Sequence, residues 1–206
     1  MKKNIAVFAS GTGSNFININ NKIKINKINA KICLLVSNNP DSGAVKFCLK
    51  NGIDFFIYNK IKFPDNSNDK KLINKINSYN IDLILLAGYM KKISKKIVEL
   101  FNHKIMNIHP SLLPLYGGKG FYGIKVHEEV FKNRDQETGA TVHFVDNNYD
   151  TGPILMQEKI QIDKNDNPNE IAKKVLKVEH DIYPKAVNLF CDNKILWKNN
   201  KPIIKE

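Results

Sequence analysis

The residues with the clearest chemical potential are Asn107 and His109, two positions apart in the octapeptide Asn-Ile-His-Pro-Ser-Leu-Leu-Pro at 107–114. Side chains two residues apart in a β-strand point to the same face, so a strand here presents an amide beside an imidazole. Pro110 cannot donate to a neighbouring strand and keeps its predecessor extended, so we expect the strand to end at His109. An imidazolium and an amide N–H can both donate to one oxygen, which stabilises a tetrahedral oxyanion.

A carboxylate beside this imidazole would orient it and raise its pKa. We expect that carboxylate to be Asp150, in the sequence Asp-Thr-Gly-Pro at 150–153, with Asp146 as the nearest competitor. The glycine and proline that follow suit a fixed turn, so turn formation is the structural alternative for Asp150. For His143, in Thr-Val-His-Phe, we expect a structural role within a strand.

Two other groups of reactive residues fail on geometry. Ser111 with His109 and Asp150 suggests a hydrolase triad, but a serine two residues after its base, without nucleophile-elbow glycines, is wrongly placed. His-Glu-Glu at 127–129 resembles the start of a zinc-protease helix, but Phe131 replaces the second histidine, so we expect a surface helix. With no nucleophile, direct transfer between two bound substrates is favoured over covalent catalysis.

A glycine-rich segment, Ser-Gly-Thr-Gly-Ser-Asn at 10–15, is the candidate anion site. Backbone N–H groups and a helix N-terminus would meet there, an arrangement that favours phosphate. The segment is no dinucleotide fingerprint, because Phe16 replaces the third glycine, and it lacks the lysine of a P-loop. An ordinary strand-to-helix turn is the structural alternative.

The elements that would position these residues alternate between strand and helix. We predict strands at 5–9, 32–36, 53–57, 81–87 and 104–108. Helices are predicted between them at 16–28, from a cap at 41 or 42 to 51, at 69–79 and, after a cap at Ser94, to 101. This alternation predicts an α/β fold with a doubly wound, mostly parallel Rossmann-like sheet, which binds ligands at the carboxyl ends of its strands.

The pattern changes after Pro114. We predict a glycine-rich loop at 115–120, a helix at 122–132 and two β runs at 139–145 and 154–162. A long helix at 168–190 and a last short strand at 195–197 follow. The short link between the β runs predicts an antiparallel C-terminal part. We expect a single domain, 1–206, with a phosphate-binding half at 1–108 and an active-site half at 109–206.

Composition limits the class of protein. Of the 206 residues 42% are apolar, enough for a core, and no apolar run approaches the roughly 18 to 20 residues that cross a bilayer. The N-terminus shows no cleavable signal pattern, so we expect a cytoplasmic protein without a membrane partner. Three widely spaced cysteines predict buried thiols rather than disulfides or a metal site.

The net charge of +12 invites comparison with nucleic-acid-binding proteins. However, Arg134 is the only arginine, and the lysines are spread among many asparagines and isoleucines, whose codons are also rich in adenine and thymine. Base composition explains this bias, so we expect no nucleic-acid partner; a basic RNA-binding module is the alternative. The charge can still attract anionic small substrates.

The octapeptide at 107–114, together with 150–153, resembles the folate-dependent formyltransferases, and the likeness runs from Ile5 to about Pro184. The loop at 10–15 looks like that of members that formylate 5-phosphoribosylglycinamide. The resemblance implies that the glycinamide amine attacks the formyl carbon of 10-formyltetrahydrofolate in de novo purine biosynthesis. The alternatives within the family are a formyltetrahydrofolate hydrolase or a formyltransferase with another acceptor, whose usual extra domains we do not expect here.

By residue, the resemblance implies that Asn107 and His109 polarise the formyl oxygen, that His109 donates a proton and that Asp150 keeps it charged. It assigns the substrate phosphate to Gly11, Thr12, Gly13, Ser14 and Asn15, and the glycinamide ribosyl part to Glu179. Folate would contact the loop at 146–150 and Met90, Lys91, Lys92, Ile93 and Asn107. The resemblance implies small-molecule partners, no metal, and a monomer or homodimer.

Lysines stand where this family often has arginines. In the stretch 58–68, where the family often has a folate-fixing arginine, the basic residues are Lys60 and Lys62, and we assign that role to neither. Lys91 and Lys92 follow Met90 where an arginine is common. A lysine supplies charge without the planar fork of arginine, which puts folate affinity in question. The glycine-rich segment at 116–120 would suit a mobile lid.

Overall fold

The computed structural model describes residues 1–59, 61 and 68–205. Its strands form a seven-stranded sheet in the order β3-β2-β1-β4-β5-β6-β7 and a two-stranded sheet of β8 and β9. By internal contacts the chain divides into two compact units, Met1–Met106 and Asn107–Glu206. The predicted α/β fold, mostly parallel with an antiparallel C-terminal part, is confirmed.

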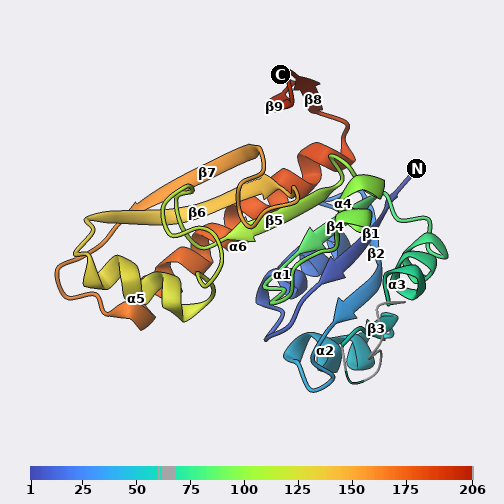
Figure 1. Ribbon diagram of the computed structural model, residues 1–206, viewed down its shortest axis with the longest axis horizontal. Helices are drawn as coiled ribbons and strands as arrows, with labels where there is room; N and C mark the ends of the chain where they lie inside the picture. The colour runs from blue at the N-terminus through green and yellow to red at the C-terminus, as the bar shows by residue number, and fades with distance from the viewer. Residues whose placement is uncertain (60, 62–67, 206) are drawn as a thin grey trace. The chain divides into compact units, whose positions relative to one another are not determined.

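The first unit, blue to green in Figure 1, alternates strands and helices. Its elements are β1 (Lys3–Phe8), α1 (Ser14–Lys24), β2 (Ala30–Ser37), α2 (Gly43–Asn51), β3 (Phe55–Ile57), α3 (Asn68–Asn77), β4 (Leu83–Leu86) and α4 (Lys95–Leu100). β1 pairs in parallel with β2 and β4, and β2 with β3. Every element was predicted, with ends that differ by a few residues, as expected where helix ends fray.

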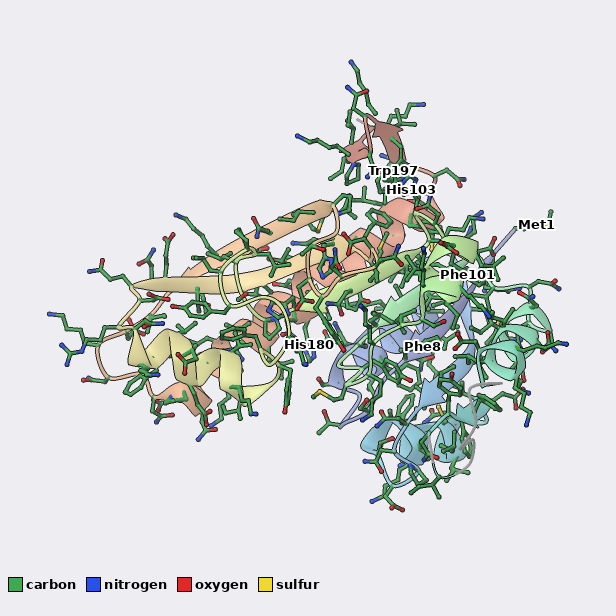
Figure 2. The ribbon with its side chains drawn as sticks, in the orientation of Figure 1. Met1, Phe8, Phe101, His103, His180 and Trp197 are labelled. Atoms are coloured by element: carbon green, nitrogen blue, oxygen red, sulfur yellow. The ribbon has the colours of Figure 1, made fainter. Side chains whose placement is uncertain are left out.

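The core of this first unit surrounds β1 and β4. Residues 5–8 and 83–86 are buried along their whole length. Such a strand, apolar on both faces, is what a parallel sheet covered by helices requires. Phe8 of β1 meets Tyr89 edge-on, with ring centroids 5.2 Å apart, inside this core (Figure 2).

The second unit runs from green to red in Figure 1. It contains the end of β5 (Ile105–His109), then α5 (Ile124–Lys132), β6 (Glu137–Phe144), β7 (Ile154–Gln161), α6 (Pro168–Cys191), β8 (Ile195–Lys198) and β9 (Lys201–Ile204). β6 and β7 pair antiparallel, as predicted. α6 packs against α5, β6 and β7, so one long helix supports much of this unit.

The prediction of a single last strand was incomplete. β9 follows β8 and pairs with it antiparallel. Between them Asn199 and Asn200 have φ values of 50° and 57°. Two consecutive left-handed residues make the tight turn that two-residue hairpins prefer, and asparagine tolerates that conformation. The Asn-Asn pair was therefore a hairpin signal in the sequence.

Helix ends follow local side-chain chemistry. Ser42 caps α2 by accepting from the N–H of Val45, and Gly52 ends it with a φ of 63°. At α6, the Asn167 side chain accepts from the N–H groups of residues 169 and 170, while the side chain of Glu170 accepts from the N–H of Asn167. These caps satisfy N–H groups that a helix leaves unpaired, which is why these boundaries were readable from sequence.

The three cysteines, all within the described residues, form no disulfide bonds. Cys48 and Cys191 are buried as predicted, whereas Cys33 is partly exposed. Burial raises the pKa of the Cys48 thiol to about 12, so it stays protonated. Within the described ranges, no helix has the length and apolar character to cross a membrane, and no cluster of three or more His, Cys, Asp or Glu side chains is arranged to hold a metal ion.

Candidate functional site

β5 ends at His109, where the sequence predicted, because Pro110 follows it. His109 is 4% exposed and Ile108 is 6% exposed. Residues alternate across a strand, so Asn107 and His109 lie on one face and Ile108 on the other. The strand thus presents the amide and the imidazole together at its carboxyl edge.

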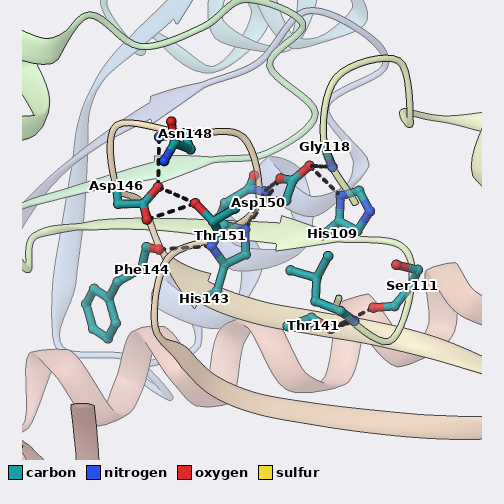
Figure 3. A network of polar contacts seen from close by, with 12 residues as sticks. His109, Ser111, Gly118, Thr141, His143, Phe144, Asp146, Asn148, Asp150 and Thr151 are labelled. Carbon is teal, nitrogen blue, oxygen red and sulfur yellow. Dashed lines mark hydrogen bonds and ion pairs between the residues drawn. The ribbon is translucent and has the colours of Figure 1, made fainter. Parts of the chain in front are cut away.

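Asp150 lies within reach of both side chains. Its Oδ2 is 3.6 Å from Nδ1 of His109 and accepts from the N–H of Gly118 at 2.9 Å (Figure 3). Its Oδ1 accepts from Nδ2 of Asn107 at 3.4 Å and is 3.6 Å from Nε2 of His143. The structure therefore brings together Asn107, His109 and Asp150, the three residues that the sequence selected for catalysis.

Asp146, the competing carboxylate, has a different role. It accepts from the hydroxyl of Thr151 at 2.9 Å and from the N–H of Asn148 at 2.9 Å (Figure 3). Both partners belong to its own link between β6 and β7, so Asp146 shapes a turn. Asp150 has a φ of 55° within the same link, a conformation that aspartate tolerates better than most residues.

The balance of burial and charge at His109 differs from expectation. Burial is the largest influence and lowers the pKa of His109, although the Asp150 carboxylate and the Tyr116 carbonyl both raise it. Asp150 thus acts in the expected direction, but desolvation outweighs the ion pair, so the net shift of the His109 pKa is downward. For Asp150, burial acts to raise the pKa, but contacts with His143, His109 and Gly118 outweigh it and lower the pKa overall.

His143 is a hydrogen-bonded strand residue, as expected, and its hydrogen bonds connect it to this network. Its Nδ1 is 2.9 Å from the carbonyl oxygen of Phe144. A carbonyl can only accept, so Nδ1 carries the hydrogen and Nε2 is left to accept from Nδ2 of Asn107 at 3.0 Å. His143 thus orients the amide of Asn107. In the sequence, the one indication of this role was the position of His143 near the carboxyl end of the strand that became β6.

The glycine-rich loop after Pro114 is hydrogen-bonded into the site. The carbonyl of Tyr116 is 2.7 Å from Nε2 of His109. Two residues later, the N–H of Gly118 donates to Asp150. This loop therefore contacts both members of the His–Asp pair.

Ser111 is unavailable as a nucleophile. It is fully buried, and its hydroxyl donates to the carbonyl of Leu115 at 2.6 Å. Thr141 on β6 donates to the carbonyl of Ser111 at 2.6 Å and accepts from the N–H of Leu113 at 3.1 Å. These bonds fix the turn after β5, which agrees with the rejection of a hydrolase triad.

α5 exposes most of its residues, as predicted for a surface helix, but His127 is not among them. It lies on the buried face of α5 with Val126 and Val130, and only 5% of it is exposed. Its Nδ1 has no hydrogen-bond partner among the described residues. Burial, with a smaller contribution from His109, lowers the pKa of His127 to about 4, so it is neutral at physiological pH.

The candidate phosphate loop belongs to the first unit. Gly13 stands at the N-cap of α1 with a φ of 78°, and a Cβ there would lie 2.9 Å from Cβ of Ala44. Gly11 and Thr12 are exposed, Ser14 is half-buried and Asn15 is buried. The first turn of a helix leaves N–H groups for a ligand, so this loop has the form of an anion site.

The segment after β4 is tied to that loop by Ser10, the first residue of the candidate anion segment, whose hydroxyl had no predicted role. The Ser10 hydroxyl accepts from the N–H of Met90 at 2.8 Å and donates to Oδ1 of Asn38. The N–H of Ser10 donates to the carbonyl of Gly88 at 3.1 Å. Of the predicted folate-lining residues, Met90, Lys91 and Lys92 are exposed and Ile93 is buried.

Glu179, the residue assigned to the glycinamide ribosyl part, is buried on α6 in the second unit. Lys60 and Lys62, the basic residues of the stretch where the family often has an arginine, lie outside the described residues.

Comparison with known proteins agrees with this geometry. Residues 3–187 match the formyl transferase family. The chain belongs to this family. This formyltransferase is 41% identical over 201 residues to the chloroplastic phosphoribosylglycinamide formyltransferase of Arabidopsis thaliana, covering 97% of this chain and 69% of that protein. It is 33% identical over 198 residues to the phosphoribosylglycinamide formyltransferase of Escherichia coli (strain K12), covering 96% of this chain and 91% of that protein.

Solved structures show the same fold. Glycinamide ribonucleotide transformylase 1 from Symbiobacterium toebii has a TM-score of 0.91 and 27% identity to this formyltransferase, covering all of this chain and 95% of the other. A formyltetrahydrofolate deformylase from Pseudomonas syringae has a TM-score of 0.89 at 18% identity and covers all of this chain and 67% of the other. The deformylase likeness concerns the fold alone.

Proposed function

We propose that this formyltransferase moves the formyl group of 10-formyltetrahydrofolate to the amine of 5-phosphoribosylglycinamide in de novo purine biosynthesis. The bacterial and plant relatives with that named activity support the choice of acceptor. The observation that carries the proposal is the convergence of Asn107 and His109 on Asp150 at the end of β5. Such a group suits direct transfer through an oxyanion without a nucleophilic residue.

The proposed chemistry begins when the amine nitrogen forms a bond to the formyl carbon. The carbonyl electron pair moves to oxygen. Asn107 then donates to that oxyanion in place of Asp150, and His109 donates to it in place of the Tyr116 carbonyl. When the intermediate collapses, the bond between carbon and the folate nitrogen breaks and that nitrogen takes a proton from His109. The amine nitrogen, once bonded to the formyl carbon, gives its surplus proton to His109, which replaces the proton that His109 gives to the folate nitrogen, so protons balance over the cycle. Each donor aimed at a developing oxyanion contributes about 3 to 4 kcal/mol.

Asp150 would act on the imidazolium that forms during this cycle. Its carboxylate stays ionised because His143, His109 and the N–H of Gly118 lower its pKa. An ionised partner 3.6 Å from Nδ1 stabilises a positive charge on His109 when that charge appears. Because burial alone disfavours the charge, we assign Asp150 to transient stabilisation rather than to a permanently charged pair.

We assign the phosphate of the substrate to Gly11–Asn15, where the cap of α1 supports an anion. Met90–Ile93 and the loop at 146–150 are assigned to the folate, together with Asn107, and Glu179 to the glycinamide ribosyl part. The exposure of Lys91 and Lys92 supports contact with an anionic cosubstrate through point charges rather than bidentate pairs. The net charge of +12 favours the approach of both anionic substrates.

The test is a turnover assay with purified protein, 10-formyltetrahydrofolate and 5-phosphoribosylglycinamide. We expect tetrahydrofolate to be released only when the ribonucleotide is present, together with formylated product. Formate released at the same rate without the ribonucleotide would identify a hydrolase instead. No release under either condition, with fresh substrates and folded protein, would refute the proposed function.

Location and assembly are further parts of the proposal. We propose small-molecule partners, a monomer or homodimer, and a cytoplasmic site of action. The plant relatives are named chloroplastic, so location needs its own experiment, namely cell fractionation with antibodies to this chain. Sedimentation at several protein concentrations would measure the oligomeric state.

A further inference from the structure

The carbonyl of Tyr116 determines which nitrogen of His109 can change its protonation state. This oxygen lies 2.7 Å from Nε2. Because a carbonyl only accepts, Nε2 must carry a hydrogen. Nδ1, which faces the Asp150 carboxylate at 3.6 Å, is then the nitrogen that gains and loses a proton. The position of this one carbonyl therefore sets the tautomer of the imidazole.

The backbone at Tyr116 does not favour this position by itself. Tyr116 has a φ of 53°, in the left-handed region that bulky residues rarely adopt. Gly117 and Gly118 follow it, and Gly118 has a φ of 96°. Glycines permit many alternative paths, so the chain here needs a separate restraint to hold the carbonyl against His109.

The Tyr116 side chain supplies that restraint. Its phenol donates to Oδ2 of Asp135 at 2.6 Å and accepts from Nδ2 of Asn133 at 2.9 Å. Its ring meets Phe121 with centroids 6.1 Å apart. Partial burial and the contact with Asp135 raise the pKa of the Tyr116 phenol, so it remains a donor at physiological pH.

The partners of the phenol are themselves fixed. Asn133 and Asp135 follow the end of α5, where the N–H of Asn133 bonds to the carbonyl of Glu129 at 2.9 Å. The N–H of Asp135 bonds to the carbonyl of Val130 at 3.2 Å. The phenol is thus anchored to a helix end, 17 to 19 positions further along the chain.

We propose that Tyr116 is a positioning residue: its phenol, anchored on Asp135 and Asn133, holds its own carbonyl against Nε2 of His109 and so fixes the Nε2–H tautomer. The titratable groups that act on His109 are Asp150 from the loop after β6, His143 from β6 and His127 from α5. The hydrogen bond at Nε2 comes from Tyr116. The effect on turnover rests on the proposed function, whereas the effect on the tautomer does not.

The test removes one oxygen atom with Tyr116→Phe and reads His109 by ¹⁵N NMR of histidine-labelled protein without substrates. Imidazole ¹⁵N shifts distinguish the two tautomers, and a His109→Asn variant assigns the signal. We expect wild type to show Nε2–H and Tyr116→Phe to show a mixture with a lower pKa for His109, because the carbonyl bond that supports the charged form is weakened. An unchanged tautomer and pKa in folded Tyr116→Phe would overturn the proposal.

Matched variants separate anchoring from general disturbance. Tyr122→Phe makes the same chemical change at an exposed tyrosine and should leave the His109 signal unchanged. Asp135→Asn keeps an acceptor and should retain the wild-type tautomer, whereas Asp135→Ala should reproduce Tyr116→Phe. If Tyr122→Phe changes the His109 tautomer as strongly as Tyr116→Phe, or if Asp135→Ala leaves that tautomer unchanged, the proposed anchoring of Tyr116 by its phenol is refuted.

Kinetics then test the consequence for catalysis. With both substrates, we expect Tyr116→Phe to lower kcat about 5- to 20-fold while both KM values stay within about twofold, as for a group that acts on the transition state. A change in the NMR signal without any formyl transfer by wild type would support the anchor and refute the proposed function. Unchanged kcat in Tyr116→Phe would overturn the catalytic part of the inference.

Discussion

His109 is 4% exposed and lies beside an ionised carboxylate, so its reactivity depends on the residues that surround it. We predict that His109→Ala or Asp150→Ala lowers kcat by about 100- to 1,000-fold, the usual result of removing one stabilising group from a transition state. In Asp150→Asn, kcat should fall less, because the amide oxygen of the new side chain can still accept from the N–H of Gly118. Steady-state kinetics with both substrates measures this. Near-normal turnover in either alanine variant would show that the assigned role is wrong.

His143 allows a second prediction, because its contact with Asn107 runs through a single acceptor nitrogen. His143→Leu removes that acceptor and leaves an amide hydrogen unsatisfied in a buried site, a cost of about 1 to 3 kcal/mol. We expect kcat to fall roughly 10- to 100-fold. His143→Gln should retain more activity, since its side-chain carbonyl can accept from Asn107. Equal activities for the two variants would argue against orientation by a hydrogen bond.

At the scale of elements, Ser10 links two segments that are both assigned to ligands. Its hydroxyl joins the end of β1 to Met90, 80 positions away, and its hydrogen goes to Asn38. We predict that Ser10→Ala raises the dissociation constant of a folate analogue about fivefold, the equivalent of one hydrogen bond worth roughly 1 kcal/mol. Titration calorimetry measures that constant.

Two further observations make this test specific to the Ser10 hydroxyl. Amide hydrogen exchange at Met90 should accelerate in Ser10→Ala, because its N–H loses its acceptor. Ser10→Thr keeps a hydroxyl at the same position and should bind the analogue more tightly than Ser10→Ala. Unchanged binding and exchange in Ser10→Ala would remove this link from the description of the site.

Prediction from sequence worked well for most elements because their limits depend on neighbouring residues. Pro110 ended β5, Ser42 and Gly52 bounded α2, and Pro168 began α6, each through its own backbone or side-chain chemistry. The final hairpin was missed although Asn199 and Asn200 encoded its turn. α5 is a surface helix as predicted, but the burial of His127 on its inner face was not foreseen, because charged residues follow it directly.

At the scale of the whole molecule, buried His127 couples stability to pH. Its pKa is 6.5 when unfolded and about 4 when folded, so between these values the unfolded chain binds the additional proton. Stability is therefore highest above pH 6.5 and falls as pH drops towards 4. At about 1.4 kcal/mol per unit, the total loss is about 3 kcal/mol. Burial of His109 acts in the same direction.

The corresponding variant is His127→Leu, which has no group to protonate. We expect the free energy of unfolding, from urea titrations at pH 7, 6, 5 and 4, to fall less steeply with acid than in wild type. The two curves should diverge chiefly below pH 6.5. Parallel curves over the whole range would show that His127 does not contribute to acid sensitivity.

The sequence by itself determined the α/β alternation, the end of β5 at His109 and the family resemblance, because each depends on contiguous residues. The tertiary structure decided that Asp150 rather than Asp146 meets the imidazole, and that His143 and Ser10 join networks. Those decisions join residues 36 to 80 positions apart. It also decided the direction of the pKa of His109, since desolvation is a property of the folded surroundings, and no spacing along the chain measures it.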